Sequence, residues 1–143
     1  FYIDQRLEPM LGKAYFDRLI PLDFLKKFQS IYSKLDRLFP KEKASLLHGD
    51  LWSGNVICGS DGKPCLIDPA VYFGHREMDL AFSRLFGGFD SRFYEAYESV
   101  LPLEPDFESR MSLYNLYPLL VHLNLFGTAY LPGIEKIINR FGS

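Results

Sequence analysis

The residues with the clearest chemical potential lie in one short stretch, His48-Gly49-Asp50-Leu51-Trp52-Ser53-Gly54-Asn55. It places a carboxylate, Asp50, and a carboxamide, Asn55, five positions apart, with glycines to bend the backbone around them. In phosphoryl-transfer enzymes, such a loop carries an Asp that accepts the proton of the acceptor hydroxyl and an Asn that holds magnesium. A second acidic residue, Asp68, follows an apolar run, where such an enzyme needs its main metal-binding Asp. The pattern therefore predicts phosphoryl transfer, with Asp50 as the base and Asn55 and Asp68 as magnesium ligands.

A β-hairpin is expected to position the two metal ligands. Residues 56–58 and 65–67 are short apolar runs, and the five residues between them contain Asp-Gly, which is typical of a hairpin turn. Asn55 would then stand at the start of the first strand and Asp68 at the end of the second, so both fall at the same end of the hairpin. The two ligands converge without any further assumption.

The rest of the sequence is predicted to be mainly helical, from apolar residues that recur every three or four positions. A first helix covers about residues 3–14, where Pro9 must start, kink or split it, and an amphipathic helix covers residues 21–39. Further helices are expected at 76–86, from Asp90 or Ser91 to Val100, at about 105–126 with a bend near Pro118, and at 132–141.

Composition and charge exclude several classes of protein. The 143 residues are expected to form a single domain, 1–143, and the net charge of −2 gives no sign of nucleic-acid binding. No membrane segment is expected, because the most apolar stretch, 113–126, is too short and too polar. Two cysteines, Cys58 and Cys65, are too few for a disulfide framework. They could face each other across the hairpin, but reduced thiols in a cytoplasmic protein are the expectation.

Four segments together resemble one enzyme family. They are the stretch from His48 to Asn55, Ile67-Asp68-Pro69-Ala70, the run from Tyr72 to Ala81, and Leu85-Phe86-Gly87-Gly88-Phe89. This combination resembles the fructosamine (ketosamine) kinase family, which is related to the aminoglycoside and choline phosphotransferases and has a protein-kinase-like fold. The resemblance runs from about residue 1 to about residue 141. It implies an α+β, predominantly helical fold: the large, carboxy-terminal lobe of a kinase, with a short hairpin that carries the metal-binding residues.

The resemblance also implies an activity and a role for each site residue. Such an enzyme would transfer a phosphoryl group from ATP, with Mg²⁺, to a sugar hydroxyl of a ketoamine, either small or linked to a protein, which is a step in deglycation. Asp50 would be the catalytic base, Asn55 and Asp68 would hold magnesium, and Trp52 would line the sugar-amine pocket. Asp79 would brace the catalytic loop from the following helix.

The two histidines near the loop are weighed from their positions in the sequence. His48 precedes the base and is expected to shape the loop through hydrogen bonds rather than to transfer a proton. His75 either starts a helix or reaches the acceptor cleft and binds substrate, and the sequence leaves both interpretations open.

One departure from the family pattern concerns the nucleotide. Such kinases have a Gly-rich phosphate loop and a strand-borne Lys, and neither occurs before residue 48. The chain, which begins with Phe1, is therefore interpreted as the carboxy-terminal lobe of a longer kinase. Alone it would lack the amino-terminal nucleotide lobe and be inactive. Two alternatives remain open: a kinase for an aminoglycoside or amino alcohol, and a binding module without catalysis.

Overall fold

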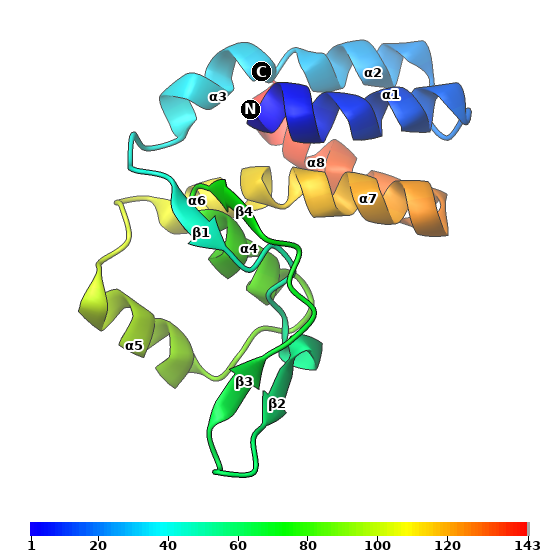
Figure 1. Ribbon diagram of the computed structural model, residues 1–143. Helices are drawn as coiled ribbons and strands as arrows, with labels where there is room; N and C mark the ends of the chain where they lie inside the picture. Colours follow the sequence, from blue (N-terminus) through cyan, green and yellow to red (C-terminus); the bar gives the residue numbers. More distant parts are fainter. Residues whose placement is uncertain (143) are drawn as a thin grey trace. The chain divides into compact units, whose positions relative to one another are not determined.

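The structure, a computed structural model that describes residues 1–142, contains two compact units (Figure 1). The helical unit comprises residues 1–40 and the chain from Asn115 onward, and the mixed unit comprises Lys41–Tyr114. The expected α+β class with mostly helices is confirmed, whereas the expectation of a single domain stays a prediction. No helix within residues 1–142 combines the length and apolarity that crossing a membrane requires.

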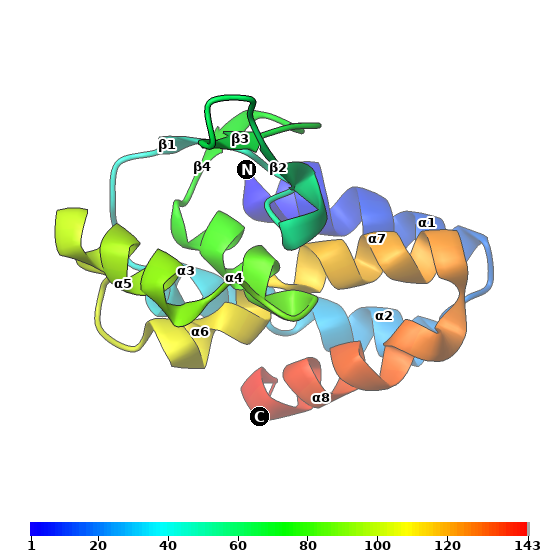
Figure 2. The same cartoon turned by 90° about the horizontal axis from the view of Figure 1, so that it is seen from below.

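The helical unit consists of helices only. A π-helical turn, Ile3–Leu7, leads into α1 (Glu8–Phe16), and Pro9 lies in the first turn of α1, so it splits this segment. The unit continues with α2 (Leu22–Gln29), α3 (Tyr32–Leu38), α7 (Leu116–Phe126), a 3₁₀ turn at Thr128–Tyr130 and α8 (Leu131–Phe141). Within this unit α7 packs against α1 and α8 (Figure 2).

Apolar faces of these helices form the core of the helical unit. Side chains from five helices are at most 2% exposed: Leu11, Ala14, Phe28, Leu35, Leu116, Leu120, Leu123, Ile134 and Ile138. Two polar contacts fix the helices further. Asn124 Nδ2 donates to the Met10 carbonyl at 2.9 Å, and Lys34 Nζ donates to the Phe141 carbonyl at 2.9 Å, near the carboxyl end of α8.

Two predicted helices are in fact interrupted, each for a local reason. The expected helix 21–39 is wrong as one element, because it breaks at Ser30 into α2 and α3. Ser30 Oγ donates to the Lys27 carbonyl at 2.7 Å, and the Ile31 amide bonds three residues back, to Phe28, at 3.2 Å. The expected bend near Pro118 lies instead at Asn115. That break leaves Pro118 in the first turn of α7, where its missing N–H costs no helical hydrogen bond.

The mixed unit holds four short strands and three helices. Strand β1 (Ser45–Leu47) pairs antiparallel with β4 (Tyr72–Gly74), and β2 (Val56–Cys58) pairs antiparallel with β3 (Pro64–Leu66). The helices are α4 (Glu77–Leu85), α5 (Ser91–Val100) and α6 (Phe107–Tyr114), and α4 packs on α6. Of the two residues at which α5 was expected to start, Asp90 or Ser91, Asp90 caps the helix, since its Oδ1 accepts from the Arg92 amide at 3.0 Å. The β1–β4 pair is an element that sequence reasoning missed.

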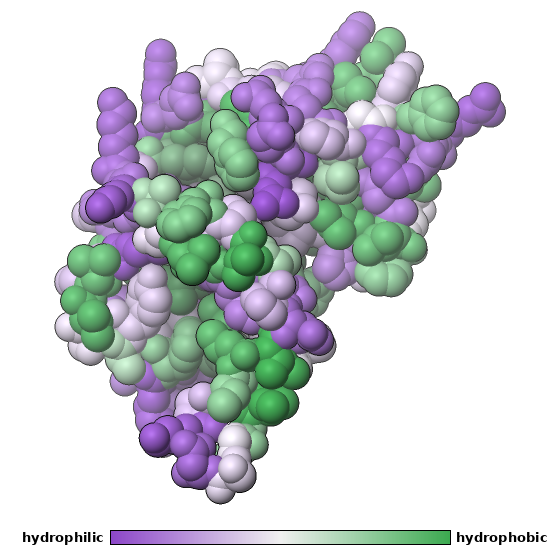
Figure 3. All heavy atoms as spheres, viewed as in Figure 1, coloured by the Kyte–Doolittle hydropathy of each residue, from purple (hydrophilic) through white to green (hydrophobic). Residues whose placement is uncertain are grey.

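The hairpin β2–β3 forms as predicted, with its second strand one residue earlier than expected. Cys58 pairs with Pro64 and Cys65 with Ile57, so the two cysteines point to opposite faces of the ribbon. The idea that they face each other is therefore wrong, and both are free and exposed. In the view of Figure 3 apolar side chains gather over the strands of the mixed unit, while the tip of the hairpin is hydrophilic.

Candidate active site

The backbone of the loop 48–55 is held by one carboxylate from the neighbouring helix. Asp79, in the first turn of α4, accepts from the His48 amide at 2.7 Å and from the Gly49 amide at 2.9 Å. Burial raises the pKa of Asp79 above its ordinary value, and the two backbone donors act in the opposite direction. A bidentate carboxylate fixes two successive amides, which is the geometry of a brace for the residue that follows, Asp50.

Gly49 is required by the close approach of a second segment. Its φ of +81° lies in the left-handed region, and a Cβ placed on it would lie 2.1 Å from the carbonyl oxygen of Ala70. The Ala70 amide in turn donates to the His48 carbonyl at 2.8 Å. The loop that carries Asp50 and the segment after Asp68 are therefore in direct backbone contact.

The His48 side chain links Asp50 to the strand that leads to Asp68. Its Nε2 lies 3.0 Å from the Ile67 carbonyl, which can only accept, and its Nδ1 accepts from the Asp50 amide at 3.3 Å. Both contacts are satisfied by the neutral tautomer with the proton on Nε2. The His48 ring therefore contacts the backbone of two segments, at Asp50 and at Ile67. These contacts are of the kind expected for a histidine that shapes the loop.

Asp50 and Asn55 are brought into direct contact. Asn55 is 7% exposed, and its Nδ2 donates both to the Asp50 carbonyl and to Asp50 Oδ2, each at 2.9 Å. Because both neighbours are acceptors, the amide orientation is fixed with nitrogen toward Asp50. Its oxygen Oδ1 is thereby turned away from Asp50.

Asp68 follows directly on a backbone contact with Asn55. The Ile67 amide donates to the Asn55 carbonyl at 3.0 Å, which extends the β2–β3 ladder by one bond. Asp68 itself is exposed and has a φ of +51°, a left-handed conformation that a non-glycine residue rarely adopts. It also precedes Pro69, which disfavours helical conformations at the residue before it. An exposed carboxylate held in a costly conformation is typical of a functional position.

The side-chain oxygens that the sequence predicts as cation ligands are those of Asp68, which is exposed, and Oδ1 of Asn55, which is turned away from Asp50. Within residues 1–142 no group of three or more His, Cys, Asp or Glu side chains is arranged to hold a metal. A site with one carboxylate and one amide fits magnesium, which retains waters and takes phosphate oxygens as further ligands. The fixed Asn55 amide and the exposed Asp68 carboxylate are compatible with such a site.

The two predicted substrate contacts lie in different surroundings. Trp52 is 38% exposed on the loop, and its carbonyl accepts from the Asn55 amide at 3.0 Å. His75 is mostly buried, and its Nδ1 lies 2.9 Å from Glu42 Oε1 and 3.4 Å from the Tyr114 hydroxyl. Its ring also lies against the Tyr114 ring, with centroids 5.4 Å apart. Its role in substrate binding stays a prediction.

A buried ion pair joins α4 to α6, and it was not predicted from the sequence. Glu77, the first residue of α4, is fully buried, and Arg110 of α6 donates to both of its oxygens at 2.8 and 3.1 Å. The Tyr114 hydroxyl donates to Glu77 Oε2 at 2.8 Å. Burial and then the Glu77 carboxylate raise the pKa of Tyr114. Nothing in the sequence around Glu77 points to a partner on α6, because Arg110 lies 33 positions away.

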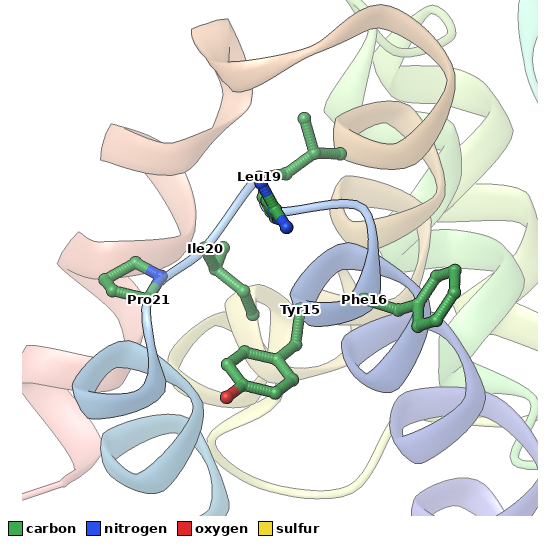
Figure 4. Close-up of a pocket in the computed structure, with 6 residues that line it drawn as sticks. Tyr15, Phe16, Leu19, Ile20 and Pro21 are labelled. Carbon is green, nitrogen blue, oxygen red and sulfur yellow. The ribbon is translucent and has the colours of Figure 1, made fainter.

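The helical unit contains a pocket of its own. It has a volume of about 570 Å³ and lies where α1 ends and the chain turns toward α2, lined by Tyr15, Phe16, Arg18, Leu19, Ile20 and Pro21 (Figure 4). None of the predicted site residues contributes to it.

Comparison with known proteins decides the family. The sequence model of the fructosamine kinase family matches residues 1–142. The chain belongs to the fructosamine kinase family. It is 43% identical over 143 residues to a protein of Lactiplantibacillus plantarum assigned as a ketoamine kinase, covering 99% of this chain and 51% of that protein. It is 43% identical over 135 residues to ketosamine-3-kinase of Mus musculus, covering 91% of this chain and 42% of the mouse protein.

A solved structure of the same family has a similar fold. The crystal structure of a protein from Thermobifida fusca assigned as a fructosamine-3-kinase superposes with a TM-score of 0.88 at 37% identity. The match covers 97% of this chain and 49% of that one. The chain therefore spans about half the length of the family members that it matches.

Proposed function

We propose that this chain supplies the catalytic loop of a kinase that transfers the γ-phosphoryl group of ATP to a sugar hydroxyl of a ketoamine. The observation that carries the proposal is the contact between Asp50 and Asn55. The loop places a carboxylate and an oriented carboxamide side by side, with its backbone held from α4 by Asp79. Membership of the fructosamine kinase family supports the choice of a ketoamine acceptor.

Each residue has a defined task in this proposal. Asp50 accepts a hydrogen bond from the acceptor hydroxyl, aims its oxygen at the phosphorus and takes its proton as the new bond forms. Asn55 and Asp68 would hold Mg²⁺, which would supply positive charge to neutralise the phosphate oxygens. The Asn55 amide also holds the Asp50 carboxylate in one orientation, so that little reorganisation is needed during transfer. Trp52 and His75 border the acceptor.

The setting of the enzyme forms part of the same proposal. The lobe is that of a protein-kinase-like fold, a reading that the similarity to the Thermobifida fusca structure supports. The intact enzyme would act on ketoamines that arise from glycation, either free or attached to proteins. We propose a cytoplasmic location, which the two free, exposed thiols of Cys58 and Cys65 support.

The test is ATP consumption by the full-length protein with fructosyl-lysine as acceptor. Asp50→Asn keeps the size of the side chain but removes the base, and it should lower kcat by about 10² to 10⁴. The matched control is Asp36→Asn, an exposed carboxylate on α3 of the helical unit, which should leave kcat unchanged. Unchanged turnover in Asp50→Asn would show that the base is assigned wrongly.

A panel of acceptors and a binding measurement decide between the alternatives. Turnover of an aminoglycoside or amino alcohol in preference to fructosyl-lysine would reject the ketoamine as substrate. Isothermal titration of the full-length protein with Mg-ATP addresses catalysis as such. Absence of binding would favour a module without kinase activity.

A further inference from the structure

Gly54 lies beneath the ring of Trp52. A Cβ placed on Gly54 would lie 2.3, 2.5 and 2.7 Å from Cη2, Cζ2 and Cζ3 of that indole. Carbon atoms of neighbouring side chains do not approach so closely, since optimal contacts lie at about 3.5–4.0 Å. The indole therefore rests directly on the bare Cα of residue 54, and no side chain on that residue is compatible with this ring position.

The backbone gives no other reason for glycine at this place. Gly54 is in the middle of the 3₁₀ turn Ser53–Asn55, and it is not among the positive-φ glycines of residues 1–142, unlike Gly49. An alanine can adopt such a conformation without strain. What glycine supplies here is room for the ring of Trp52.

We propose that Gly54 is a positioning residue that sets acceptor specificity by fixing the position of the Trp52 ring on the loop that carries Asp50 and Asn55. This inference rests on the proposed function and adds a determinant of substrate binding to it. A ketoamine carries an amine, which is cationic when protonated, next to its sugar. The face of an indole attracts such a cation, which changes affinity by about 2- to 30-fold.

The effect should appear in acceptor binding rather than in the chemical step. Asn55 is held by backbone bonds to Trp52 and Ile67, and its side chain is held by Asp50. None of these contacts involves the indole ring. A ring displaced by a side chain at residue 54 therefore leaves the base and the oriented amide in place.

Steady-state kinetics of Gly54→Ala in the full-length protein test this separation. With fructosyl-lysine varied at saturating ATP, KM should rise about fivefold to twentyfold while kcat changes less than about threefold. KM for ATP should stay unchanged. Gly12→Ala and Gly133→Ala are the matched controls, because a Cβ at either position meets no atom within 4 Å, and both should behave as the wild type.

Fluorescence reports the ring directly. Subtracting the emission of Trp52→Phe from that of the wild type gives the contribution of Trp52 in the wild type. Subtracting the emission of the double variant Trp52→Phe/Gly54→Ala from that of Gly54→Ala gives the contribution of Trp52 in the Gly54→Ala protein. This contribution should shift to longer wavelength in Gly54→Ala, because a displaced ring is more exposed to water. In a Trp52→Ala background, Gly54→Ala should change KM for the acceptor less than about twofold, because there is no ring left to move.

The outcomes separate the two proposals. The proposal that Gly54 positions the Trp52 ring is wrong if the wild type turns over fructosyl-lysine and Gly54→Ala has the same KM for fructosyl-lysine and the same Trp52 emission as the wild type. An equal rise in KM with and without Trp52 also overturns it, because the effect would not pass through the ring. If the wild type itself does not turn over fructosyl-lysine, the proposed function fails, and the specificity inference falls with it.

Discussion

Removing Arg110 should reveal how strongly the mixed unit depends on one buried ion pair. Glu77 is fully buried and accepts three hydrogen bonds, two from Arg110 and one from Tyr114. Arg110→Met keeps most of the aliphatic volume of the side chain but removes two of these three hydrogen bonds. Of the three, the buried Glu77 carboxylate then keeps only the bond from the Tyr114 hydroxyl. Arg110 also donates to the carbonyls of Glu104 and Pro105, which would lose this donor.

The expected cost follows from the burial of the pair. Breaking a buried ion pair from one side typically costs about 3–5 kcal/mol, because the remaining charge is uncompensated. Two lost hydrogen bonds to a charged group, at about 1.5–3 kcal/mol each, give a similar figure. We therefore expect Arg110→Met to lower the free energy of unfolding by about 4 kcal/mol.

Urea unfolding of the 143-residue chain measures this cost. Trp52 is the single tryptophan of the sequence and belongs to the mixed unit, so its fluorescence follows the unit that contains the ion pair. At a slope of about 2 kcal/mol per molar urea, the midpoint should fall by about 2 M.

A second Arg–Glu pair between the same two helices provides the control. Arg84 of α4 pairs with Glu108 of α6, but the Glu108 side chain is 68% exposed. Exposed pairs contribute about 0–1 kcal/mol, so Arg84→Met should shift the midpoint much less than Arg110→Met. Adding Glu77→Gln should recover part of the loss in Arg110→Met, because the unpaired charge is removed. Equal costs for the two arginine variants would refute the reasoning from burial.

Three further outcomes are expected. In Asp79→Asn the side chain can accept from only one of the two backbone amides that Asp79 holds. The free energy of unfolding in urea should fall by about 1–3 kcal/mol, and ATP turnover should also fall. Wild-type values of both would show that Asp79 does not hold the loop. Gly49→Ala brings a Cβ within 2.1 Å of the Ala70 oxygen at a φ of +81°, so it should cost at least about 3 kcal/mol; a normal melting temperature would contradict this contact. Above about pH 10 the unfolded chain releases the Tyr114 proton while the folded chain, in which burial and Glu77 raise the pKa of Tyr114, retains it. Stability should therefore fall between about pH 9 and about pH 11, and Tyr114→Phe should reduce this fall, as urea midpoints at the two values would show.

Features that depend on neighbours in the sequence were predictable. The Asp-Gly turn between two apolar runs predicted the β2–β3 hairpin. The start of α5 was expected at Asp90 or Ser91, and Asp90 is the residue that caps it. The five-residue spacing of Asp50 and Asn55 on a glycine-containing loop predicted that both would serve one site, and the structure places them in contact. In each case the determining interactions span only a few residues.

Features that depend on distant partners were missed. The strands β1 and β4 are three residues each, and neither has enough sequence to show an alternating pattern before the other pairs with it. Helices α2 and α3 share one continuous apolar periodicity, so the break at Ser30 was hidden in the pattern. The partner of Glu77 lies 33 positions away on another helix, and no local signal connects the two.

The sequence by itself determined the chemistry at the loop: which acids, which amide and which glycines stand within reach of one another along the chain. Tertiary structure alone decided their orientation. Asp79 holds two loop amides from 30 and 31 residues away, and the segment around Ala70 closes on Gly49. The physical reason is that the sequence gives the type of each side chain directly. The orientation of a side chain depends on hydrogen bonds and close contacts that form only when separate elements have packed together.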